Sequence, residues 1–83
     1  MIIKVTAEDI AKGRRMSVRL CPIALAVSRH FQTEEVKVVA ELQVGNARYF
    51  LPYEARRFIG RFDNRLSVEP FDFILDPISV YGN

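Results

Sequence analysis

The sequence predicts a small α+β domain in two layers, with helices on one face of a largely antiparallel sheet. The chain has 83 residues and 49% of them are hydrophobic, which suits a single domain with one thin core. Some segments alternate apolar and polar residues, as strands do, and others repeat apolar residues at helical spacing. Their order is β-α-α-β-β-α-β, which predicts one domain over residues 1–83 with helices packed on a four-stranded sheet.

The first part of the chain contains signals for a strand, a short helix and a loop. Residues 2–5 are β-branched apart from one lysine, which predicts a strand. Thr6 and Asp9 have the spacing of a capping box, which predicts a helix over residues 7–12. Residues 13–20 begin with a glycine that ends this helix and continue as a polar, basic stretch without a clear period, so they predict a loop.

A second helix is predicted to begin at Pro22, because the first helical position needs no backbone N–H. Its apolar period extends over about eleven residues. Ile23, Val27 and Phe31 share the apolar face, with His30 beside them. We therefore expect His30 to be a core or boundary side chain near the helix C-terminus.

A β-hairpin is predicted in the middle of the chain. Residues 36–44 alternate as a strand with one polar face, and residues 47–51 follow as a partner strand. Between them, Gly45 and Asn46 form a two-residue pair that tolerates the positive φ of a tight turn.

A third helix is predicted from Pro52 to the pair Asp63–Asn64. Its apolar stripe follows the i, i+3, i+4, i+7 rule and consists of Ala55, Phe58, Ile59 and Phe62. Residues 71–75 alternate as a last strand. Pro70 before them lacks a backbone donor, so it belongs at the start of that strand or on a sheet edge. Residues 78–83 are expected to form a loose tail.

The charge is small overall but uneven along the chain. The net charge is +2, and nine of the twelve basic residues are arginines. Because the arginine fork suits carboxylates, phosphates and buried interfaces, this bias indicates a macromolecular partner. The candidate binding residues form two groups. They are Arg14, Arg15 and Arg19 in the loop before the second helix, and Arg57, Arg61 and Arg65 along and just beyond the third helix.

These arginines leave three interpretations open: an acidic protein surface, nucleic-acid phosphates, or solvent. The low net charge argues against nucleic acid. Most aromatic side chains also fall on core stripes instead of forming stacking platforms, with Tyr49 and Tyr53 as exceptions.

Cys21 is the residue that would support an enzyme. It precedes the second helix, where the helix dipole and nearby arginines favour a thiolate. A nucleophile also needs a base in reach, and His30 lies roughly 13 Å away along the helix. We therefore expect a buried, non-catalytic Cys21 and no cofactor. One Cys and one His do not supply a tetrahedral metal site, so we expect no metal either.

The longest uninterrupted apolar run, residues 22–27, is far shorter than the ~20 residues of a membrane span. A single cysteine also forms no internal disulfide, the staple that small secreted domains usually use. We expect a cytoplasmic protein that binds no membrane, and homo-oligomer formation remains an open alternative.

Four short motifs are spread over most of the chain. They are Ile-x-x-Gly at residues 10–13, Cys-Pro-x-Ala-Leu-Ala at residues 21–26, Phe-x-x-x-Phe-Asp at residues 58–63 and Pro-Phe-x-Phe at residues 70–73. Together they resemble a family of short proteins encoded in phage and prophage genomes, from which the basic pair Arg14–Arg15 departs. The resemblance carries no activity. It implies a phage protein in a host cell, a setting in which small proteins often bind one target as takeover or anti-defence inhibitors.

Three hypotheses follow, in order of support. The first is a small non-enzymatic binding protein that inhibits a host protein or nucleoprotein complex through its basic surface. The second is a nucleic-acid-binding accessory protein that uses the arginines. The third is an enzyme that depends on Cys21.

Overall fold

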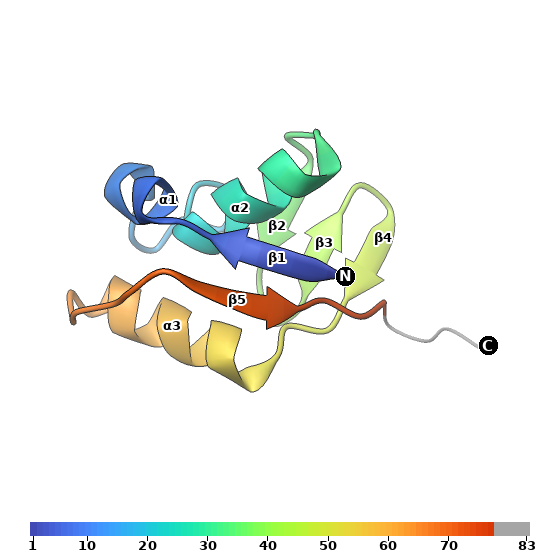
Figure 1. Ribbon diagram of the computed structural model, residues 1–83. Coiled ribbons are helices and arrows are strands. Elements are labelled where there is room, and N and C mark those ends of the chain that lie inside the picture. The colour runs from blue at the N-terminus through green and yellow to red at the C-terminus, as the bar shows by residue number, and fades with distance from the viewer. Residues whose placement is uncertain (78–83) are drawn as a thin grey trace.

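The computed structural model describes residues 1–77 and contains, within them, three helices and five strands (Figure 1). In chain order these are β1 (Ile2–Val5), α1 (Ala7–Lys12), α2 (Pro22–Phe31), β2 (Val36–Val38), β3 (Leu42–Val44), β4 (Ala47–Tyr49), α3 (Tyr53–Asp63) and β5 (Phe71–Ile74). All pairs of strands are antiparallel, so the predicted α+β class is confirmed. The predicted tail, residues 78–83, lies outside the described residues.

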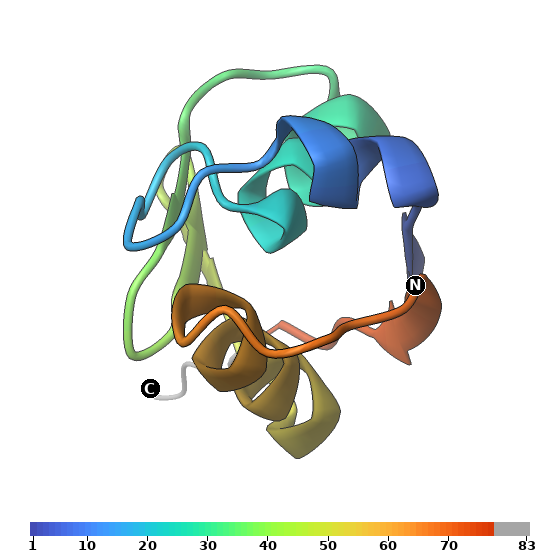
Figure 2. The ribbon, with the colours of Figure 1, turned by 90° about the vertical axis from the view of Figure 1, so that its left-hand side faces the viewer.

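The strands form two sheets instead of the single four-stranded sheet that we expected. β1 pairs with β5, while β2, β3 and β4 form a second sheet in that order. The segments that follow β4 and β5 connect the two sheets at one end, where the Phe50 N–H donates to the Asp76 carbonyl at 3.1 Å and Tyr49 forms an isolated bridge with Pro77. Figure 2 shows the sheets on opposite sides of the core, with α1 and α2 at one end and α3 at the other. The expected placement of all helices on one face of a sheet is therefore wrong.

The strand predicted over residues 36–44 is interrupted at residues 39–41. The Val39 N–H donates to the Glu41 carbonyl at 2.9 Å, which closes a tight turn and brings Val38 opposite Leu42. The turn contains none of the usual turn residues, and the alternation of apolar and polar residues continues through it. The sequence therefore did not predict this turn. The next turn is confirmed as predicted, because Gly45 has a φ of +57° between β3 and β4.

The helix ends follow the sequence signals. In α1, the Thr6 hydroxyl accepts from the Asp9 N–H at 3.2 Å, and the Asp9 carboxylate accepts from the Thr6 N–H at 2.9 Å, which completes the capping box. Gly13 follows α1 with an extended backbone. A Cβ at Gly13 would lie 2.6 Å from the Pro22 ring, so close packing of α1 against the start of α2 explains the glycine.

The core is assembled from the predicted apolar stripes. Its buried side chains include Ile3, Val5, Ile23, Val27, Val36, Leu42, Ala55, Phe58, Phe73 and Leu75. Ile59 and Phe62 are half-buried and pack against this cluster. His30 differs from its expected place, since it is exposed to solvent and contacts Phe31 edge-on with ring centroids 4.9 Å apart.

Candidate functional site

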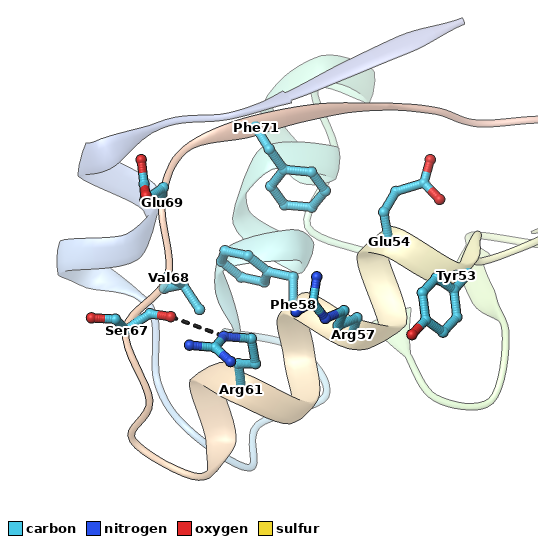
Figure 3. Close-up of a pocket in the computed structure, with 9 residues that line it drawn as sticks. All are labelled: Tyr53, Glu54, Arg57, Phe58, Arg61, Ser67, Val68, Glu69 and Phe71. Carbon is cyan, nitrogen blue, oxygen red and sulfur yellow. Dashed lines mark hydrogen bonds between the residues drawn. The ribbon is translucent and has the colours of Figure 1, made fainter.

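A groove of about 440 Å³ lies between α3 and the segment that leads into β5 (Figure 3). One wall comes from successive turns of α3 and consists of Tyr53, Glu54, Arg57, Phe58 and Arg61. The other wall consists of Ser67, Val68, Glu69 and Phe71. The α3 residues share this wall because side chains three or four positions apart lie on the same side of a helix.

The floor of the groove is aromatic. The Phe58 ring stacks on Phe71 with centroids 4.9 Å apart and lies parallel to Phe62 at 6.1 Å. Phe71 in turn stacks on Phe73 at 5.7 Å. Phe58 is only 6% exposed, so the floor is continuous with the hydrophobic core. An apolar side chain of a ligand would therefore meet a preformed aromatic surface.

Two of the predicted binding residues line this groove. The Arg61 Nε donates to the Ser67 carbonyl at 3.0 Å and so holds the opposite wall in place. Within residues 1–77, neither Arg57 nor Arg61 belongs to an ion pair. Glu54 and Glu69 also line the groove, one on each wall. The site is thus mixed in charge instead of uniformly basic.

Tyr53 lies at the α3 N-terminal end of the groove and is 67% exposed. Tyr49 instead is half-buried and contacts Phe31, with ring centroids 5.6 Å apart. Of the two tyrosines that we singled out as exceptions to the core pattern, only Tyr53 therefore presents a free ring beside the arginines.

The other four predicted arginines do not line the groove. The Arg15 guanidinium lies over the Phe62 ring, 5.8 Å from its centroid. Arg19 lines a separate shallow hollow beside β2 and β3. Arg14 and Arg65 are exposed, and Arg65 follows α3 with a φ of 62°. The structure thus brings Arg57 and Arg61 together and leaves the other arginines on different surfaces.

The basic loop is fixed to the C-terminal end of α3. The Met16 N–H donates to the Asp63 carboxylate at 2.9 Å, and the Arg14 N–H donates to the Leu20 carbonyl at 2.9 Å, which holds the two ends of the loop together. Met16 has a φ of 57° and is 80% exposed. The loop is therefore an ordered projection beside α3.

Cys21 is a buried helix cap. It is 3% exposed, and its Sγ accepts from the Ala24 N–H at 3.5 Å at the start of α2. Burial raises the pKa of the Cys21 thiol above its ordinary value. The effect of burial on the pKa of the thiol thus outweighs the stabilisation of a thiolate by the helix dipole. His30 lies at the other end of α2.

Among residues 1–77, no three His, Cys, Asp or Glu side chains come together as metal ligands would. No helix in the same range has the length and apolar character that crossing a membrane requires.

Comparisons with protein-family models, with curated proteins and with solved structures find no match to this chain.

Proposed function

We propose that this chain is a small non-enzymatic binding protein that recognises a protein partner through the groove between α3 and residues 67–71. The observation that carries the proposal is the position of Arg57. Arg57 lines the groove whose floor is formed by Phe58 and Phe71, and it has no ion-pair partner among the described residues. Arginine and aromatic side chains next to each other are typical of the residues that dominate binding energy at protein interfaces.

The mixed charge of the groove favours a protein over a nucleic acid. A phosphate backbone would be attracted by Arg57 but repelled by Glu54 and Glu69, which line the same groove. A polypeptide supplies charges of both signs and apolar side chains at a spacing that such a site can match.

A finer proposal concerns the partner. The resemblance to short phage and prophage proteins supports a host protein as the target and inhibition of that protein as the outcome. The basic loop that is bonded to Asp63 at the end of α3, with Met16 exposed, would offer the partner a second contact surface beside the same helix.

Charge reversal on α3 tests the proposal with a matched control. Arg57→Glu and Arg56→Glu change the same charge on adjacent residues, but Arg56 lies outside the groove and lines a separate hollow with Glu41 and Phe50. We expect immobilised wild type and Arg56→Glu to retain the same protein from a lysate of the producing cells, and Arg57→Glu to lose it. With the captured protein purified, affinity for Arg57→Glu should fall by about tenfold or more.

Equal retention by both variants, with circular dichroism showing that each is folded, would reject the groove as the interface. Arg57→Glu is preferred to a double change with Arg61, because Arg61 also holds residue Ser67 through a hydrogen bond. A loss of binding in the double variant could then reflect a displaced wall instead of a lost charge.

Nucleic-acid binding is the second candidate, and the exposed ring of Tyr53 beside Arg57 is the observation that favours it. It predicts that single-stranded nucleic acid binds with a log affinity that falls steeply with log salt, and that Arg57→Glu reduces the slope. A shallow slope, or no binding, would leave the protein partner as the function of the groove.

A further inference from the structure

The strand β5 has an open edge. Met1 and Leu75 exchange both backbone hydrogen bonds, with the Met1 amine donating to the Leu75 carbonyl at 3.2 Å and the Leu75 N–H donating to Met1 at 2.8 Å. In an antiparallel ladder such pairs alternate with pairs that are not bonded to each other. By the register of β1 and β5, Phe73 belongs to the next bonded pair. The N–H and C=O groups of Asp72 and Ile74 therefore point away from β1.

The other side of the ladder confirms this alternation independently. Lys4 lies opposite Asp72, so its carbonyl should point to the outer edge of β1. There it accepts a hydrogen bond from the Arg29 guanidinium at 2.9 Å. The outer edge of β1 is thus partly covered by a side chain of α2. On the outer edge of β5, within residues 1–77, no backbone hydrogen bond outside the ladder involves Asp72 or Ile74.

β5 continues the chain segment that forms one wall of the groove. Figure 1 shows β5 between β1 and α3. The groove wall ends at Phe71, which is the first residue of β5. The free donors and acceptors of Asp72 and Ile74 therefore follow directly after this wall along the chain. Pro70, which precedes β5, lacks a backbone N–H of its own.

This inference rests on the proposed function: we infer that the groove binds an extended segment of the partner protein that carries apolar side chains and one carboxylate. The segment adds to the β1–β5 sheet as a third strand along β5. Main-chain hydrogen bonds to Asp72 and Ile74 would hold the segment, as in other cases of strand addition. Alternate side chains of a strand point to opposite faces. One set would pack on the floor of Phe58 and Phe71, and a carboxylate of the segment would pair with Arg57.

The test uses linear peptides selected on the immobilised wild-type protein from a displayed random library and then made synthetically. Ile74→Pro removes an outward N–H of β5 without removing a bond of the β1–β5 ladder. Ile2→Pro is the matched control, because Ile2 lies opposite Ile74 and its N–H points to the outer edge of β1. We expect Ile74→Pro to weaken peptide binding by about three- to tenfold, the effect of one net hydrogen bond, and Ile2→Pro to leave it unchanged.

A second measurement leaves the protein intact. N-methylation at each peptide position in turn should weaken binding at every second residue, because only alternate N–H groups of an added strand point to β5. In the complex, the amide proton of Ile74 should also exchange with solvent more slowly than in the free protein.

The results separate this inference from the function on which it rests. Peptides that lose affinity with Arg57→Glu, but respond to neither Ile74→Pro nor N-methylation with period two, would overturn strand addition and retain the groove as the binding site. Failure to select any linear peptide would also overturn strand addition. The proposed function would then still be judged by capture of the partner with Arg57→Glu and Arg56→Glu.

Discussion

Arg56 and Arg57 are adjacent in the chain, yet one helical step of about 100° directs them to different surfaces. Arg57 lines the groove between α3 and residues 67–71, and Arg56 lines a separate hollow with Glu41 and Phe50. Sequence spacing places both arginines off the apolar stripe of Ala55, Phe58, Ile59 and Phe62. Sequence spacing did not distinguish Arg56 from Arg57. Arg57 is a groove residue only because residues 67–71 form the opposite wall, and this segment has no periodic pattern that would predict its position.

Cys21 is subject to two opposing influences, its position at a helix start and its burial. Its place before α2 favours a thiolate, but burial raises the pKa of the thiol. We predict that Cys21→Ser leaves partner binding unchanged and alters the free energy of unfolding by no more than about 1 kcal/mol, because serine is also a good N-cap. Binding titrations and urea denaturation of the variant check both statements. Loss of function in a variant that remains folded would instead favour the enzyme hypothesis.

At the scale of elements, one ion pair connects α1, α2 and β1. The Arg29 guanidinium donates to both Asp9 carboxylate oxygens at 2.7 and 2.9 Å, and to the Lys4 carbonyl at 2.9 Å. Asp9 is 4% exposed. Burial alone would raise the pKa of Asp9, but the hydrogen bonds from Arg29 and Thr6 outweigh it, so the pKa lies below its ordinary value of 3.8.

This pair makes stability depend on pH. A carboxyl group whose pKa is lowered by folding stabilises the folded state above its unfolded pKa, and the contribution is lost as the pH falls through the folded pKa. We predict that Asp9→Asn lowers the free energy of unfolding by about 2 kcal/mol at neutral pH. The gap between wild type and variant should close below the ordinary pKa of 3.8. Urea titrations at a series of pH values measure the gap, and a gap that stays constant into strong acid would contradict this role of Asp9.

The helices and one turn were predictable from the sequence, whereas the pairing of the strands was not. All three helices and the Gly45–Asn46 turn were predicted, because caps, prolines, glycine and apolar periods are local signals. The turn at residues 39–41 was missed, since a period of two continues through a reversal that lacks turn residues. The pairing of β1 with β5 joins the two ends of the described chain, and no local pattern reports a partner so distant. One sheet was therefore predicted where two exist.

At the scale of the whole molecule, the groove exists because α3 is the one described helix that covers its side of the core. Figure 2 shows α1 and α2 together on one side and α3 alone on the other. α3 is held there by its aromatic contacts with β5 and by the hydrogen bond from Met16 to Asp63. The sequence predicted the apolar stripe and the arginines of α3. The second wall, residues 67–69, depends on how the chain returns from α3 to β5, which has no sequence signature.

Phe58 serves both the core and the groove, so its truncation tests how α3 is attached to the whole molecule. We predict that Phe58→Ala lowers the free energy of unfolding by about 3–5 kcal/mol, the usual cost of removing a buried aromatic ring. Tyr53→Ala is the control, because the Tyr53 ring on the same helix is 67% exposed and its loss should cost less than about 0.5 kcal/mol. Denaturant titrations of the two variants give the comparison. A cost below about 1 kcal/mol for Phe58→Ala would mean that the stack of Phe58 on Phe71 contributes little to folding. In that case the main role of the Phe58 ring would be to contact a ligand in the groove, and not to stabilise the core.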